Sequence, residues 1–109
     1  MKVLSLLAAA AAMFAFSMTA SAAVDADAAT KAMKDNGCTK CHSVDKAKKG
    51  PAFKTVAADM KGKADAEAKL TTFLTTGPKI KMDDGTQEEH KALKDPAVVK
   101  NLVQFILAQ

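Results

Sequence analysis

Cys38-Thr39-Lys40-Cys41-His42 is the stretch that decides how this sequence folds. Its C-x-x-C-H spacing is the attachment pattern of a c-type haem. Each thiol adds across one vinyl group of the haem, and the His that follows the second Cys reaches the iron as the proximal ligand. We therefore predict one covalently attached haem c, with Cys38 and Cys41 as its thioether residues and His42 as an iron ligand.

Paired cysteines have two other common uses. A structural zinc site needs further ligands, but the sequence has no second Cys pair and one other His, His90. A dithiol redox centre also contains C-x-x-C and is the main alternative. The His directly after the second Cys favours haem over both.

The N-terminus has the pattern of an export signal. Lys2 precedes an apolar run over residues 3–16, which only Ser5 interrupts, and Ala20-Ser21-Ala22 matches an A-x-A cleavage site. A retained membrane anchor has less support because the run is shorter than the roughly 20 residues of a spanning helix. We predict a signal peptide at residues 1–22, one mature domain at residues 23–109 and a periplasmic location, since c-type haem is attached outside the cytoplasm.

The mature domain is small and mildly basic. Without Lys2 it has 15 Lys against 12 Asp and Glu, and its sequence contains no Arg, Trp or Tyr. Nucleic-acid binding is therefore not expected, because the side chains that read and stack on bases are missing. A domain of 87 residues has a small hydrophobic core and usually needs an additional cross-link for stability, which a covalently attached haem supplies. The Lys excess suggests a basic ring around the haem edge that steers acidic redox partners, and the solvated surface favours a monomer.

Apolar spacing and helix-ending residues predict four helices in the mature domain. Their expected positions are residues 25–35, a short helix that carries Val56, Ala57 and Met60 and ends near Gly62, residues 65–76, and Asp95-Pro96 onward. The last helix has the broadest apolar face. No strand is predicted, and the polar stretch between the third and the last helix is expected to be a loop.

The order of these pieces resembles the small bacterial class I c-type cytochromes. The similarity runs from the helix that ends at Asn36-Gly37, through the haem motif and Gly50-Pro51-Ala52-Phe53, to the apolar last helix, and it is ungapped over residues 36–77. The resemblance implies an all-α cytochrome c fold, in which four to five short helices surround one haem and the first and last helices cross. It also implies that Pro51 lies close to His42 and that its carbonyl region orients the imidazole.

Two residues compete for the distal iron position. Most members of this family use a Met on the loop before the last helix as the distal ligand. In relatives of this length, the distance in sequence from that Met to the aromatic residue that matches Phe105 is about one residue more than the distance from His90 to Phe105. His90 lies fifteen residues before Phe105, and Met82 lies twenty-three before it. We therefore favour His90 as the distal ligand and keep Met82 as the alternative; a second imidazole would give a lower reduction potential than a thioether.

His90 also has a purely structural interpretation. The residues Thr86–Glu89 fit a helix capping box, which would place His90 on a solvated helical turn and strengthen the case for Met82. The remaining Met residues of the mature domain, Met33 and Met60, fall within predicted helices and are assigned to the core.

The function that the resemblance implies is that of a periplasmic carrier of single electrons, not an enzyme. Two strong protein ligands leave the iron no open position for a substrate, and the sequence has no phosphate loop, dinucleotide fingerprint or nucleophile motif. The expected partners are redox proteins that dock transiently at the haem edge, including peripheral contact with membrane respiratory complexes. A haem-based gas-binding or sensor protein with a displaceable distal ligand is the alternative.

Overall fold

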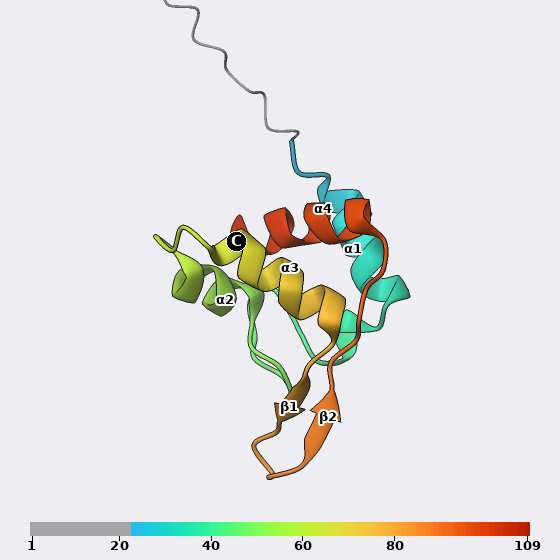
Figure 1. Ribbon diagram of the computed structural model, residues 1–109, viewed down its shortest axis with the longest axis vertical. Helices are drawn as coiled ribbons and strands as arrows, with labels where there is room; N and C mark the ends of the chain where they lie inside the picture. Colours follow the sequence, from blue (N-terminus) through green and yellow to red (C-terminus); the bar gives the residue numbers. More distant parts are fainter. Residues whose placement is uncertain (1–22) are drawn as a thin grey trace, which may run out of the picture.

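The computed structural model describes residues 23–109, and the predicted signal peptide at residues 1–22 lies outside the described residues. Four α-helices, one 3-10 turn and one β-hairpin make up this part (Figure 1): α1 (Ala26–Asp35), η1 (Cys38–Lys40), α2 (Phe53–Met60), α3 (Ala66–Thr76), β1 (Lys79–Lys81), β2 (Gln87–Glu89) and α4 (Pro96–Leu107). The helices agree with the predicted ones to within a residue or two at each end. Within residues 23–109, no helix combines the length and apolar character needed to cross a bilayer.

Helix α4 is the centre of the helical layer, because α1, α2 and α3 each pack against it. It begins at Pro96, where the Asp95 carboxylate accepts hydrogen bonds from the backbone amides of Ala97 (2.9 Å) and Val98 (3.3 Å). Its apolar face forms much of the core: Val99, Leu102, Val103 and Ile106. The predicted contact between the first and last helices is present, and fully buried Ala29 on α1 is small enough to let them approach closely.

The start of α1 is fixed on α4 by a reciprocal pair of hydrogen bonds. The backbone amide of Asp25 donates to Oδ1 of Asn101 (2.9 Å), and Nδ2 of Asn101 donates to the Asp25 carbonyl (2.8 Å). The Asp25 carboxylate also caps α1 by accepting from the amide of Ala28 (2.9 Å). Since η1 follows α1 after two residues, these contacts also place the haem motif relative to α4.

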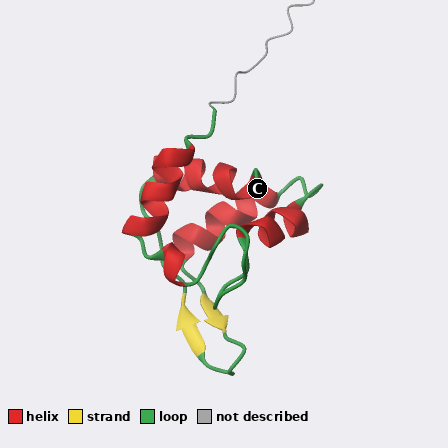
Figure 2. Cartoon of the chain, turned by 180° about the vertical axis from the view of Figure 1, so that it is seen from behind, coloured by secondary structure: helices red, strands yellow, loops and turns green. Residues whose placement is uncertain are grey.

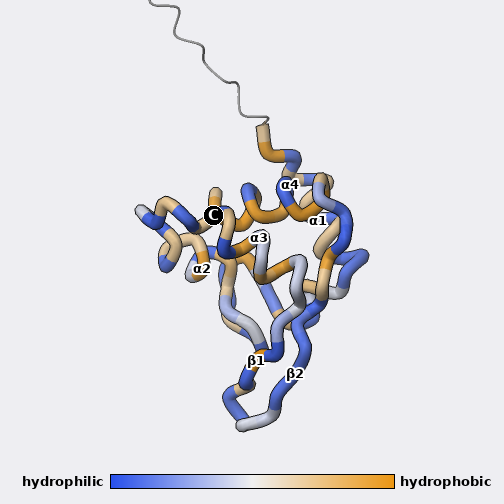
Figure 3. Tube along the Cα trace, in the orientation of Figure 1, coloured by the Kyte–Doolittle hydropathy of each residue, from blue (hydrophilic) through white to orange (hydrophobic). Residues whose placement is uncertain are grey.

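The β-hairpin extends away from the helices (Figures 1 and 2). Its strands are antiparallel, with Lys79 opposite Glu89, Ile80 opposite Glu88 and Lys81 opposite Gln87. Most of its side chains are charged or polar, and Figure 3 shows the hydrophilic hairpin against the hydrophobic α4. None of the residues 79–89 is buried in the core.

This hairpin corrects the expectation of an irregular loop and of a helix cap at Thr86–Glu89. The Oδ1 atom of Asp84 accepts from the Thr86 amide (2.9 Å) and from the Thr86 hydroxyl (2.6 Å). The amide of Met82 donates to the Thr86 carbonyl (2.7 Å), and Gly85 takes a φ of 85° between them. Thr86 therefore directly follows a β-turn over residues 82–85, and its hydroxyl donates to Asp84 instead of capping a helix.

Candidate haem site

Residues 38–53, which we term the proximal loop, close on themselves through backbone hydrogen bonds. The amide of His42 donates to the Cys38 carbonyl (2.9 Å), and the amide of Gly50 donates to the Cys41 carbonyl (2.8 Å). The first bond belongs to the turn that contains η1, and the second brings the far end of the loop back to it. The two Cys and His42 are thereby held on one compact turn.

The imidazole of His42 is oriented by three neighbours. Its Nδ1 lies 2.8 Å from the Pro51 carbonyl, and because a carbonyl only accepts, Nδ1–H is the donor and Nε2 keeps a free lone pair. The ring stacks on Phe53, with ring centres 5.1 Å apart and planes 19° from parallel. Gly50 lies behind the ring, where a Cβ would come within 2.8 Å of Nδ1 and 2.9 Å of Nε2. Nε2 is therefore the atom available to a metal.

His90 directly follows β2, and its ring lies next to that of His42. The two ring centres are 6.1 Å apart, and the planes are tilted by 57°. The Nδ1–H of His90 donates to the Lys91 carbonyl (3.1 Å), so Nε2 keeps its lone pair here as well. The ring also meets Phe73 edge-on, with centres 4.8 Å apart.

The pKa values at the site favour a neutral His90 and an unreactive Cys38. Burial is the main cause that lowers the pKa of His90, and nearby His42 lowers it further. The hydrogen bond to the Lys91 carbonyl opposes this shift in part, and the net lowering of the pKa favours the neutral ring, which is the form that binds a metal. Burial raises the pKa of the Cys38 thiol, whereas the nucleophilic Cys of a redox dithiol has a lowered pKa. The surroundings of Cys38 do not favour the dithiol alternative.

One cavity of about 640 Å³ brings together all six predicted site residues: Cys38, Cys41, His42, Pro51, Met82 and His90. This volume falls within the range of roughly 300–1,000 Å³ found for ligand and cofactor sites. Much of the remaining wall is apolar and comes from α2, α3, β1 and α4: Phe53, Val56, Leu70, Phe73, Leu74, Ile80 and Ile106. Two thiols and two imidazole lone pairs around an apolar cavity fit an iron porphyrin attached through its vinyl groups.

The methionines divide between core and cavity. Met33 is 5% exposed and belongs to the core, as predicted. Met60 was also predicted to be core, but it lies near the end of α2, where it is half-buried and lines the cavity. Met82 lines the cavity from the hairpin turn, where its carbonyl accepts from the amide of Gly85 (3.0 Å). Both candidate distal residues therefore reach the same cavity.

Sequence reasoning missed the aromatic partners of the two imidazoles. Phe53 was noted only within Gly50-Pro51-Ala52-Phe53, and Phe73 was not singled out from the predicted helix at residues 65–76. A signal for Phe73 was present, because it stands directly beside buried Leu74. Adjacent apolar residues point to different sides of a helix, so α3 has a second apolar side in addition to its core contact.

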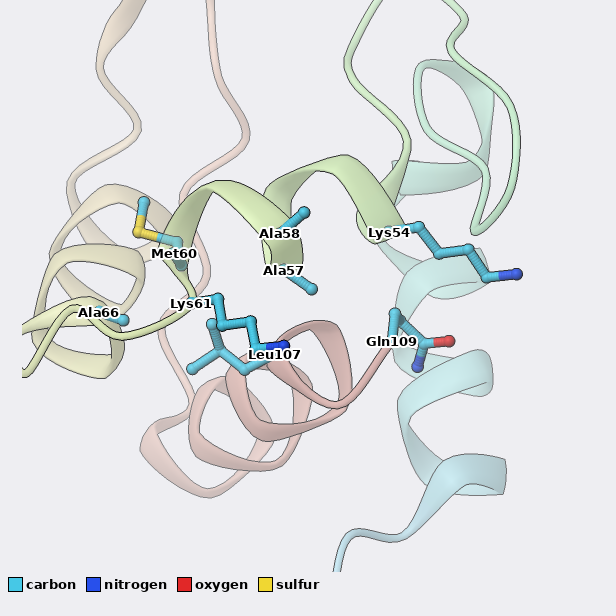
Figure 4. A pocket seen from close by; sticks show the side chains of 8 residues that line it. All are labelled: Lys54, Ala57, Ala58, Met60, Lys61, Ala66, Leu107 and Gln109. Carbon is cyan, nitrogen blue, oxygen red and sulfur yellow. The ribbon is translucent and has the colours of Figure 1, made fainter.

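A second hollow of about 510 Å³ lies between α2 and the C-terminal end of α4 (Figure 4). Eight residues line it, among them three Ala and two Lys: Lys54, Ala57, Ala58, Met60, Lys61, Ala66, Leu107 and Gln109. None of the six predicted site residues lines this hollow. The candidate chemistry is confined to the larger cavity.

Comparison with known proteins identifies the family of this chain. The cytochrome c family profile matches residues 26–109. The class 1 cytochrome MtoD from Sideroxydans lithotrophicus ES-1 is 52% identical, with a TM-score of 0.76 over 79% of this chain and 97% of that one. Cytochrome c552 from Nitrosomonas europaea is 30% identical, with a TM-score of 0.59 over 76% of this chain and 96% of that one.

Curated relatives match a shorter stretch. Cytochrome c-551 from Pseudomonas aeruginosa is 46% identical over 44 residues, which is 40% of this chain and 42% of that protein. Cytochrome c-551 from Pseudomonas denitrificans is 46% identical over 46 residues, which is 56% of that protein. The chain thus spans about half the length of the curated relatives it matches.

The resemblance predicted from the haem motif and Gly50-Pro51-Ala52-Phe53 is confirmed by these matches, and so is the mostly helical cytochrome c fold. The hairpin adds a small two-stranded sheet to that fold. The chain belongs to the cytochrome c family as a small class I member, and its cofactor is covalently attached haem c.

Proposed function

We propose that this protein is a periplasmic carrier of single electrons whose haem iron is held between His42 and His90. Cys38 and Cys41 would form the two thioether bonds, as their place in the C-x-x-C-H motif implies. The observation that carries the axial assignment is the pairing of two imidazoles at one cavity, each with Nδ1 bonded to a carbonyl and Nε2 free. Met82 remains the alternative distal ligand.

The separation of the two rings supports this assignment. An imidazole nitrogen binds a metal at about 2 Å, and it lies roughly 1 Å from the centre of its own ring, so two imidazoles that bind one ion from opposite sides would have centres about 6 Å apart. The centres of the His42 and His90 rings are 6.1 Å apart. The tilt of 57° between the planes is compatible with this arrangement, because rotation of either ring about its metal–nitrogen bond leaves that bond intact.

The residues around the rings favour electron transfer over substrate chemistry. Bound haem supplies an iron that alternates between the ferrous and ferric states. The carbonyls of Pro51 and Lys91 hold the two imidazoles in fixed tautomers and orientations, so both ligands can stay in place in either state. Apolar side chains from α2, α3 and α4 line the site and would limit the access of water to a bound haem. If His42 and His90 both bind the iron, no position would be left for a substrate, which is why we propose a carrier and not an enzyme.

The surface near the cavity bears on the kind of partner. Three Lys line the cavity, Lys49, Lys81 and Lys91, together with three acidic residues, Asp83, Glu88 and Glu89. The rim is therefore mixed in charge and not the uniform basic ring suggested by the excess of Lys. We propose transient docking of redox proteins whose contact surfaces are also mixed in charge.

Near-infrared magnetic circular dichroism of the oxidised holo-protein tests the axial ligands. Its charge-transfer bands distinguish an iron–thioether centre from a bis-imidazole centre. We expect the bis-imidazole band, its loss in His90→Ala and its retention in Met82→Ala. The opposite pattern in the two variants would assign the distal position to Met82.

Carbon monoxide separates the carrier from the gas-binding or sensor alternative. A reduced haem with two firmly held imidazoles should be inert to the gas on the timescale of mixing. Rapid binding by the wild-type protein would contradict the carrier and support a displaceable distal ligand. The His90→Ala protein provides the positive control, since removal of the ligand opens the sixth position.

A further inference from the structure

The chain from Gly77 to Leu93, which we term the distal segment, leaves the end of α3, forms the hairpin and returns to α3. On its return, the His90 amide donates to the Pro78 carbonyl (2.9 Å), and the Leu93 amide donates to the Leu74 carbonyl (2.8 Å). Leu93 is 5% exposed and belongs to the core. The returning backbone is thus fastened to the end of α3 on both sides of Gly77.

Gly77 ends α3 in the left-handed conformation, with φ 57° and ψ 59°. A Cβ at this position would lie 2.6 Å from the carbonyl oxygen of His90, 3.0 Å from Cβ of Ala92 and 3.2 Å from the amide nitrogen of Ala92. Two of these three atoms belong to the backbone, so no rotamer change can relieve the overlap. The backbone at His90 and Ala92 would have to move away from α3 by several tenths of an ångström.

Two other glycines show that the left-handed conformation is only part of the reason why position 77 requires glycine. Gly62 has a φ of 78° and Gly85 a φ of 85°, and a Cβ on either would meet no heavy atom within 4 Å. All three positions favour glycine because of their φ. Gly77 alone among these three is also in direct contact with the backbone that carries a proposed iron ligand.

We propose that Gly77 is a positioning residue for His90. Because Gly77 has no side chain, the backbone at His90 can lie directly on the end of α3, and this contact sets how far the His90 ring reaches toward His42. Metal sites tolerate displacements of only about 0.5 Å in their ligands. This role rests on the proposed function, since it requires His90 to be the distal ligand.

The test compares Gly77→Ala with Gly62→Ala in the holo-protein. Both substitutions place Ala at a positive φ, so both should lower the melting temperature. Only Gly77→Ala should shift the electron paramagnetic resonance g values of the ferric haem and make the ferrous haem reactive toward carbon monoxide. Unchanged g values and continued inertness in Gly77→Ala, or an equal spectral shift in Gly62→Ala, would overturn the assignment of Gly77.

A second pair of variants separates contact from backbone strain. Asn tolerates the left-handed conformation better than Ala and still carries a Cβ, so Gly77→Asn keeps the overlap with the His90 carbonyl at a lower conformational cost. Gly77→Asn should shift the g values, whereas Gly62→Asn should not. Unchanged g values in Gly77→Asn would refute the role of the contact with the His90 carbonyl. This pair decides the matter if Gly77→Ala fails to fold.

Failure of the axial assignment has a different signature. An iron–thioether band in the near-infrared spectrum of the wild-type protein would remove both the bis-imidazole proposal and the role of Gly77. A bis-imidazole band in the wild type, combined with unchanged g values in the Gly77 variants, would refute only the role of Gly77.

Discussion

The proximal loop and the distal segment each bring one imidazole to the same cavity, but they hold it by different means. His42 belongs to a loop closed by its own backbone bonds, and its ring stacks on Phe53, which is 6% exposed. His90 follows an exposed hairpin, and its ring meets the edge of Phe73, which is 38% exposed. The proximal ring is therefore packed on the core, whereas the distal ring depends on how the returning chain contacts α3.

This difference predicts which properties can be changed separately. On the proximal side, a change that moves the ring also disturbs the core, so ligation and folding should fail together. On the distal side, a change can alter the surroundings of the iron while the four helices remain packed. Paired substitutions at equivalent places in the two regions test this contrast.

The largest expected difference is between Phe53→Ala and Phe73→Ala. Removal of a buried Phe costs about 3–5 kcal/mol, so Phe53→Ala should lose that much unfolding free energy together with the stacking partner of His42. Phe73→Ala removes an exposed side chain and should cost about 1 kcal/mol. Guanidinium denaturation of the two holo-proteins measures both values. Equal losses would show that the distal aromatic is as much a part of the core as the proximal one.

The next comparison uses two glycines. A Cβ at Gly50 would overlap the ring of His42, so Gly50→Ala should cost about 1–3 kcal/mol in unfolding free energy and shift the absorption bands of the haem. Gly85→Ala, in the hairpin turn, meets no atom within 4 Å and should cost about 1 kcal/mol from its positive φ, with no spectral change. Denaturation and visible absorption of the two holo-proteins distinguish these outcomes. A spectral shift in Gly85→Ala would contradict the separation of the hairpin turn from the iron ligands.

The same contrast explains what could be predicted from the sequence. The arrangement of the proximal loop could be predicted because its parts are close in the chain: C-x-x-C-H indicates the proposed attachment residues, and Pro51 follows His42 by nine positions. The hydrogen bond between His42 and the Pro51 carbonyl needs no distant element apart from this loop. The helices were predictable for a similar reason, since each has a local end signal such as Asp95-Pro96.

The distal segment was harder to predict because its structure depends on contacts across the fold. Strands of three residues are too short to show an alternating pattern, and Thr86–Glu89 matches a helix cap equally well until Asp84 engages the Thr86 hydroxyl. Gly77 directly follows the third predicted helix, which ends at residue 76, but its contact with the His90 carbonyl joins positions 13 residues apart. That contact exists only once the hairpin has returned to α3.

The smallest expected effect concerns the hairpin tip. Hydrogen bonds from Thr86 lower the pKa of Asp84, so its carboxylate stabilises the turn above the unfolded-state pKa of about 3.9. This contribution is lost as the pH falls through the lower folded-state pKa. We expect the protection factor of the Thr86 amide in hydrogen exchange to fall in acid in the wild-type holo-protein. In Asp84→Asn, whose neutral amide oxygen is a weaker acceptor than a carboxylate, protection at neutral pH should be lower than in the wild type and should lack the acid transition.

The haem spectrum followed through the same titration shows whether the hairpin tip influences the distal ligand. His90 is fastened at the base of the hairpin by the Pro78 carbonyl, and not at the tip, so the tip should open in acid while the axial-ligand bands stay constant. Asp65 is the matched control, because its pKa is also lowered, by Lys69, but at the start of α3. Asp65→Asn should leave the exchange of Thr86 unchanged. Ligand bands that follow the Thr86 transition would mean that the whole hairpin, and not its contact with α3, holds His90 in place.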